Sequence, residues 1–162
     1  MRKWVFGRIN LRALEHSART AVAAMASLLA TRLFRLPEAY WAPITTLIVM
    51  QSTLGAALTV SAQRFAGTAL GAAVGALVAT FLPTNVLVFG AAVFVVGIAC
   101  ALLRFELYRF ASITLAIILL IQHNQPATVT AVHRFVEVSV GIVVALALTA
   151  LWPEGQTRAA KR

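Results

Sequence analysis

RFAGTALGAAVGALVATFL, residues 64–82, is the stretch of the chain that decides the fold. Its glycines Gly67, Gly71 and Gly75 stand four residues apart, so a helix formed by this stretch carries them on one face. A face of nearly bare backbone lets a second helix approach closely, and close van der Waals contact drives helix association in lipid. The stretch therefore predicts a membrane helix that packs against another helix, within the subunit or between subunits. A narrow wall of a substrate path is the alternative function of this face.

Further apolar runs flank this stretch on both sides. We predict six spans, at about 17–34, 40–58, 64–82, 85–103, 110–123 and 133–152. Each approaches the roughly 20 residues that a bilayer requires. Of the 162 residues, 60% are hydrophobic and 12% are charged, against about 45–50% and about 25% in soluble domains. So few charges cannot keep so much apolar surface dissolved, which excludes most soluble enzymes. We expect an all-α integral membrane protein, a bundle of six transmembrane helices.

The basic residues indicate the domain limits and the orientation. Residues 1–16 predict a cytoplasmic amphipathic segment, residues 17–153 the six-helix transporter domain, and residues 154–162 a short basic cytoplasmic tail. With the N-terminus inside, eleven Lys and Arg residues fall in the cytoplasm and three outside, with Arg64 counted inside and Arg134 outside. This excess predicts a bacterial inner-membrane protein with both termini in the cytoplasm. Because the charges stand between apolar runs, the net charge of +9 does not indicate nucleic-acid binding.

A shift of 70 residues brings the two halves of the chain into register. ArgPhe at 64–65 then falls on ArgPhe at 134–135, and Gly71 falls on Gly141. Each half holds three predicted spans, and an odd number of spans gives the halves opposite orientations, as in the inverted repeats of many secondary transporters. We interpret the similarity as a 3+3 inverted repeat. Chance similarity between two helices that each begin with Arg is the alternative.

A few charged side chains at or inside the predicted spans are candidate site residues. Arg64 and Arg134 stand at the starts of their spans, where a guanidinium that faces the bundle would grip a carboxylate through its planar fork. Snorkelling to the membrane interface is the alternative for both side chains. Glu137 stands one turn after Arg134 and predicts an ion pair with it, with proton coupling as the alternative.

Two further candidates stand in the second predicted span. Gln51 lies inside the apolar run and cannot easily bond back to its own helix, so it predicts a lining of the substrate path or an interhelical hydrogen bond. Trp41, after Tyr40, predicts an aromatic anchor at the interface, with a stacking surface for an aromatic substrate as the alternative. The single Cys100 excludes a thiolate cluster, and the sequence holds no metal, nucleophile or phosphate-loop motif. We expect no enzyme activity, no metal and no cofactor.

Two stretches carry a resemblance to a known family. LPEAYWAPITTLIVMQSTLGAAL, residues 36–58, and QRFAGTALGAAVG, residues 63–75, resemble the fusaric acid resistance (FUSC-like) family, also called aromatic acid exporters. HRFVEVSVG, residues 133–141, is similar to that family's last helix, and the resemblance covers about residues 12–153. Glu137 stands where the family pattern often has Asp. The matching positions are Trp41, Gln51, Gly55, Arg64, Gly67, Gly71, Arg134 and Gly141.

The resemblance implies a six-helix transporter unit that exports aromatic or other organic anions. Many members join two such units through a cytoplasmic domain, whereas this chain holds one unit, so we expect a homodimer, with the glycine face of residues 64–82 as a candidate for its contact. Our first interpretation is an inner-membrane exporter subunit for amphipathic organic anions such as aromatic carboxylates. A passive organic-anion channel and an accessory membrane protein without transport activity are the alternatives. The expected partners are a small organic anion and the lipid bilayer, not nucleic acid.

Overall fold

The computed structural model describes residues 11–102, 107–121 and 125–152. These residues form α1 (Leu11–Leu33), α2 (Trp41–Val49), α3 (Leu54–Phe81), α4 (Val86–Leu102), α5 (Tyr108–Leu120) and α6 (Ala127–Leu151). The all-α class is confirmed. The tail predicted at 154–162 lies outside the described residues, as do residues 1–10 of the predicted amphipathic segment. The remainder of that segment is continuous with α1 rather than a separate helix.

The extent predicted for the second span, 40–58, is wrong. α2 has only 9 residues and ends where the Met50 N–H donates to the Thr46 carbonyl at 2.9 Å. α3 begins at Leu54, ten residues before the predicted start, and Thr53 caps it by accepting a hydrogen bond from the Ala56 N–H at 3.3 Å. Hydropathy misses this break because the residues on both sides of it are apolar.

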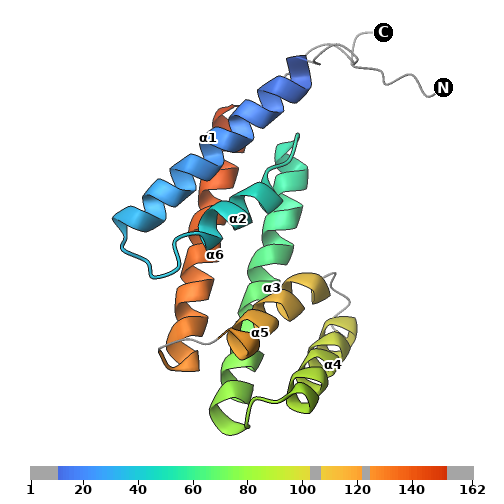
Figure 1. Ribbon diagram of the computed structural model, residues 1–162. Coiled ribbons are helices and arrows are strands. Elements are labelled where there is room, and N and C mark those ends of the chain that lie inside the picture. Colours follow the sequence, from blue (N-terminus) through green and yellow to red (C-terminus); the bar gives the residue numbers. More distant parts are fainter. Residues whose placement is uncertain (1–10, 103–106, 122–124, 153–162) are drawn as a thin grey trace, which may run out of the picture.

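Two long helices form the centre of the molecule, and each carries a short one (Figure 1). α3 and α6 pack side by side in opposite directions, with the rings of Phe65 and Phe135 4.8 Å apart between their centroids. The short α2 packs on α6, and the short α5 packs on α3. α1 covers α2 and α6 on one side, while α4 covers α5 on the other (Figure 1).

The glycine face of α3 is occupied by α5. A Cβ added at Gly67 would lie 2.7 Å from the Phe110 Cβ, and one at Gly75 would lie 3.2 Å from the Ile118 Cβ. At Gly71 the added Cβ would collide with the backbone of Ala111. The predicted close helix packing is therefore found within the subunit. Because α5 already covers this face, a dimer contact at the glycines is wrong, while the homodimer itself stays a prediction.

Gly141 of α6 allows the close approach of α2, as the glycines of α3 allow that of α5. A Cβ at Gly141 would collide with the Ala42 carbonyl oxygen and lie 2.8 Å from the Thr45 Cβ, both on α2. The Thr46 hydroxyl of α2 donates to the Gly141 carbonyl at 3.0 Å and to the Ala42 carbonyl of its own helix at 3.0 Å. Small residues thus bring each short helix into contact with the backbone of its long neighbour.

Large apolar side chains cover the outer surface and many polar side chains are buried, as expected of a protein surrounded by lipid. Large apolar residues such as Met25, Leu29, Phe94 and Val143 are more than 60% exposed on the outer surface. By length and composition, two of the described helices, α3 and α6, can cross a membrane. The buried polar side chains are Arg19, Ser27, Thr31, Thr45, Thr46, Ser61, Arg64, Thr68, Thr114, Thr130, Arg134, Glu137 and Thr149.

Candidate functional site

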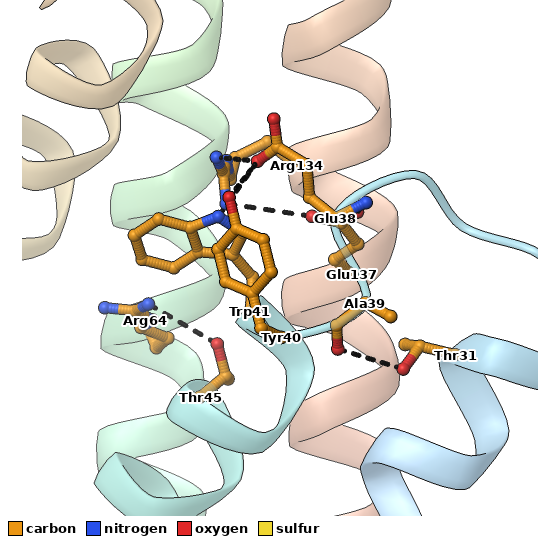
Figure 2. Close-up of polar contacts among 9 residues, drawn as sticks. All are labelled: Thr31, Glu38, Ala39, Tyr40, Trp41, Thr45, Arg64, Arg134 and Glu137. Atoms are coloured by element: carbon orange, nitrogen blue, oxygen red, sulfur yellow. Dashed lines mark hydrogen bonds and ion pairs between the residues drawn. The ribbon is translucent and has the colours of Figure 1, made fainter. Parts of the chain in front are cut away.

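Arg64 and Arg134 lie inside the bundle, on the two central helices (Figure 2). Each is 2% exposed. Arg64 lies ten residues after the start of α3, and Arg134 lies seven residues after the start of α6. The prediction that both residues begin their helices is therefore wrong, because the two helices extend further toward their N-termini than the apolar runs do. Their burial also contradicts snorkelling to the interface for both side chains.

Arg134 is surrounded by two carboxylates and one aromatic face. Its Nη2 lies 2.5 Å from the Glu38 Oε2, and its Nη1 lies 3.7 Å from the Glu137 Oε2, which confirms the predicted pair with Glu137. The Glu137 Oε1 also accepts a hydrogen bond from the Glu38 N–H at 3.0 Å. The guanidinium carbon of Arg134 lies 3.9 Å from the centroid of the Trp41 ring, within the range of a cation–π contact.

Trp41 faces this network rather than a lipid headgroup. Its Nε1–H donates to the Glu38 Oε2 at 2.9 Å while its ring stacks on Arg134 (Figure 2). The neighbouring Tyr40 is 51% exposed, and its ring is tilted by 42° to that of Trp41. Trp41 therefore stacks on an arginine of its own chain, and its role as a stacking surface for an aromatic substrate stays a prediction.

The turn after α1 places Glu38 at Arg134. Arg35 has a left-handed φ of 52°, the Leu36 N–H donates to the Thr31 carbonyl at 3.1 Å, and the Arg35 N–H donates to the Arg32 carbonyl at 3.0 Å. These two bonds form a Schellman motif, which ends the helix and reverses the chain. The Thr31 hydroxyl also donates to the Ala39 carbonyl at 3.1 Å. The segment that carries Glu38 is therefore held to both α1 and α6.

Arg64 is buried without a carboxylate among the described residues. Its Nη2 makes a long contact of 3.4 Å with the Thr45 hydroxyl, and its Nε and Nη1 have no hydrogen-bond partner. Its guanidinium carbon lies 5.1 Å from the centroid of the Phe110 ring. Burial of an unpaired charge costs far more than one weak contact returns. Such a group is suited to receive an anion.

Both short helices begin beside these arginines. The first residue of α2 is Trp41, which stacks on Arg134, and the third residue of α5 is Phe110, which stacks on Arg64. The N-terminus of a helix carries a partial positive charge, of about half an elementary charge. Two such termini add to the positive potential of the site. In transporters, helices interrupted inside the bundle aim their N-termini at anionic substrate groups.

Gln51 does not join the arginine pair. Its Nε2 donates back to the Ile48 carbonyl at 3.4 Å, contrary to the expectation that it could not bond to its own helix. Its own carbonyl accepts a bond from the Arg19 Nη2 at 2.6 Å, and the Arg19 Nη1 donates to the Trp152 carbonyl at 2.8 Å. Arg19 thus joins the C-terminal ends of α2 and α6 to α1. Gln51 lies at this junction.

A cavity lies at the other end of the bundle. It has a volume of about 610 Å³ and is lined by residues of the α3–α4 turn and the C-terminal end of α5, among them Asn85, Phe89 and Leu119. The predicted path residues Arg64, Arg134, Trp41 and Gln51 do not line it. The candidate anion site therefore rests on the two arginines and their surroundings, not on this cavity.

Sequence reasoning missed Glu38, Phe110 and Arg19. The chain has only five acidic residues against fourteen basic ones, and Glu38 is one of the five. An acidic residue next to an aromatic pair at a span boundary is a usable signal for an ion pair with a buried Arg. Phe110 carries no such signal, because an apolar ring in an apolar run is indistinguishable from a packing residue. Arg19 was counted among the cytoplasmic charges, although it is fully buried.

A comparison with protein families gives one match. The family model described as fusaric acid resistance protein-like matches residues 22–148, most of the chain and all of the candidate path residues. No curated protein and no solved structure matches the chain.

Proposed function

The chain belongs to the fusaric acid resistance protein-like family, and from this we propose that it is a bacterial inner-membrane transporter subunit that exports amphipathic organic anions such as aromatic carboxylates. The family description and the apolar outer surface support a membrane protein with a role in transport or resistance. The class of substrate is our inference from the site, since family membership alone does not supply it.

Buried Arg64 is the single observation that carries the proposal. It is 2% exposed, and two of its three guanidinium nitrogens have no hydrogen-bond partner. A substrate carboxylate would satisfy these donors through charge-assisted hydrogen bonds, which are about twice as strong as neutral ones. The unpaired charge is thus explained by a ligand that arrives during transport.

Aromatic rings beside the guanidiniums support an aromatic substrate. Phe110 stacks on Arg64 and Trp41 stacks on Arg134, while Phe65 and Phe135 meet between the two helices. An aryl carboxylate would place its charge on Arg64 and its ring among these side chains, where offset or edge-to-face contacts between rings are favourable.

We also propose the 3+3 inverted repeat within a bundle of six spans. The shift of 70 residues that aligns Gly71 with Gly141 also brings the bounds of α1, α2 and α3 close to those of α4, α5 and α6. Gly71 receives α5, and Gly141 receives α2. Phe65 and Phe135 are also 70 residues apart, and they contact each other. Contact between equivalent residues is expected where a two-fold axis passes between the halves.

The predicted orientation, with both termini in the cytoplasm, stands as part of the proposal after one revision. Arg64 and Arg134 are buried in the bundle, so neither belongs in the count of interfacial charges. Arg19 is fully buried as well, and removing all three leaves nine basic residues inside and two outside. The asymmetry that supports the positive-inside assignment is therefore kept.

The proposal is tested by the flux of benzoate into proteoliposomes that hold the purified chain. Arg64→Lys keeps the charge but loses the planar fork, and we expect it to reduce apparent affinity by roughly ten- to hundredfold. Arg109→Lys is the matched control, because Arg109 lies 5.8 Å from the same Phe110 ring but is exposed. Equal flux by wild type and Arg64→Lys across substrate concentrations would remove the fork from the mechanism.

The same assay distinguishes a coupled exporter from a passive channel. We propose Glu137 as the coupling carboxylate, since it is 1% exposed and lies beside Arg134. An imposed proton gradient should then drive benzoate against its own gradient in wild type but not in Glu137→Gln. Benzoate flux that ignores the proton gradient indicates the channel, and the absence of any flux indicates an accessory protein.

A further inference from the structure

The two buried arginines differ in one respect. Arg134 has Glu38 and Glu137 as carboxylate partners, whereas Arg64 has none among the described residues. In other respects their settings match: each is 2% exposed, stacks on an aromatic residue in the first turn of a short helix, and precedes a phenylalanine of the central pair. The difference therefore comes from the carboxylates, and above all from Glu38.

Glu38 is held as a ligand would be held. Its Oε2 lies within hydrogen-bonding distance of the Arg134 Nη2, the Trp41 Nε1 and the Tyr40 hydroxyl, at 2.5, 2.9 and 3.3 Å. It belongs to the connection between α1 and α2, not to a helix, and its side chain is 24% exposed, while that of Arg134 is 2% exposed. The partly exposed Glu38 carboxylate, on a connecting segment, thus contacts a buried guanidinium and two aromatic side chains.

We propose that Glu38 is a specificity-determining residue that occupies the second of two anion positions, so that the site accepts monocarboxylates and rejects dicarboxylates. This inference rests on the proposed function of Arg64 as the position for the substrate carboxylate. With Glu38 on Arg134, a second carboxylate of the substrate meets a position that is already filled and a negative charge that repels it.

The charges give the expected direction. Glu38→Gln removes one negative charge and leaves Glu137 as the carboxylate partner of Arg134. The site of Glu38→Gln with a dicarboxylate bound then has the same net charge as the wild-type site with a monocarboxylate bound. The variant should therefore gain dicarboxylates relative to monocarboxylates.

The test measures flux of benzoate and of its three dicarboxylate analogues, phthalate, isophthalate and terephthalate, in proteoliposomes. These three probes place the second carboxylate at different distances from the first on the same ring. We expect wild type to carry benzoate and to exclude all three, and Glu38→Gln to raise the flux ratio of at least one dicarboxylate to benzoate by about tenfold or more. A ratio does not depend on how much protein is active, so a loss of stability alone does not change it.

Two further variants complete the experiment. Glu15→Gln is the matched control, because Glu15 accepts a hydrogen bond from the Trp152 Nε1 at the junction of α1 and α6 and has no contact with Arg64 or Arg134, and it should leave the ratio unchanged. Glu38→Gln combined with Arg134→Gln should lose the gain, because the freed position requires the Arg134 guanidinium. If Glu38→Gln does not insert, Glu38→Ala must raise the ratio in the same direction, since it also removes the carboxylate from Arg134.

The outcomes separate the two proposals. If wild type carries none of the four probes, the proposed function fails and this inference fails with it. If wild type carries benzoate and no Glu38 variant changes the ratio, the function stands and Glu38 only fastens the connection to α6. Wild-type flux of a dicarboxylate at a rate similar to that of benzoate also overturns the inference.

Discussion

Gly71→Ala tests the contact on which the arrangement of α3 and α5 depends. The added Cβ would lie 2.9 Å from the carbonyl carbon and 3.0 Å from the Cα of Ala111, and closer still to its carbonyl oxygen. All three atoms belong to backbone, so no side chain can turn away. For an ordinary contact with the carbonyl oxygen, the closest of the three, α5 must move from α3 by about 1 Å, against a closely packed interior.

The expected loss of stability follows from this displacement. Overpacking of this kind costs about 1–3 kcal/mol, while replacing a helical Gly by Ala returns up to about 1 kcal/mol through helix propensity. Gly90→Ala in α4 is the control, because a Cβ there would meet nothing within 4 Å and only the gain in helix propensity applies. The difference between the two variants is therefore the cost of overpacking. Gly71→Ala should therefore be less stable than Gly90→Ala by about 1–3 kcal/mol. Each kcal/mol lowers the Tm by about 2–4 °C in a chain of this size.

Cys100 provides the assay. It is the single cysteine of the chain, it is 2% exposed, and it packs in one cluster with Ala111 and Leu115 of α5. Leu70 and Val74 of α3 pack against the same cluster. A thiol-reactive fluorophore should therefore label Cys100 in detergent only when this cluster of α3, α4 and α5 opens, so the temperature of labelling reports on the packing of α5 against α3. If Gly71→Ala is labelled at the same temperature as Gly90→Ala or above it, the close approach of α5 to α3 is refuted.

Three further predictions concern other parts of the fold. Arg19→Met removes donors from the carbonyl groups that end α2 and α6 and should lower stability by about 2 kcal/mol or more in the same assay; an unchanged labelling temperature contradicts this role. Arg35→Gly should raise the labelling temperature, because a left-handed φ of 52° destabilises a residue with a side chain by about 1 kcal/mol relative to glycine. A lower labelling temperature would contradict backbone strain at Arg35. In a Cys100→Ala background, a cysteine at Asn85 should react only from outside and one at Thr53 only from inside, and the reverse pattern refutes the orientation.

The parts of the fold that sequence could predict are those that depend on one helix at a time. The positions of the four runs at 17–34, 85–103, 110–123 and 133–152 agree with α1, α4, α5 and α6 to within about seven residues at each end. The close packing of the 64–82 glycines and the pair of Arg134 with Glu137 are also local consequences of helical spacing.

What sequence could not give are the relations between helices. The break between α2 and α3 contains Gln51, Ser52 and Thr53, three polar residues too few to divide the apolar run by hydropathy, and of these Thr53 is a favourable N-cap residue. Hydropathy also gives no depth, so the sequence leaves open whether Arg64 faces the bundle or snorkels to the interface. Nor does a glycine face identify its partner, so the sequence alone does not distinguish packing on α5 from packing on a second subunit.

The glycine face and the anion site are parts of one arrangement. Gly67 allows the Phe110 Cβ to approach so closely that an added Cβ would lie 2.7 Å from it, and the same Phe110 ring lies 5.1 Å from the Arg64 guanidinium carbon. A side chain at Gly67 would displace the first turn of α5, and with it both the aromatic face and the helix N-terminus beside Arg64. Gly67→Ala should therefore reduce the affinity for benzoate, whereas Gly75→Ala, two turns further along the same face and against the Ile118 side chain, should leave that affinity unchanged. Equal affinity in the two variants would show that the glycines serve packing only and that the position of α5 does not shape the anion site.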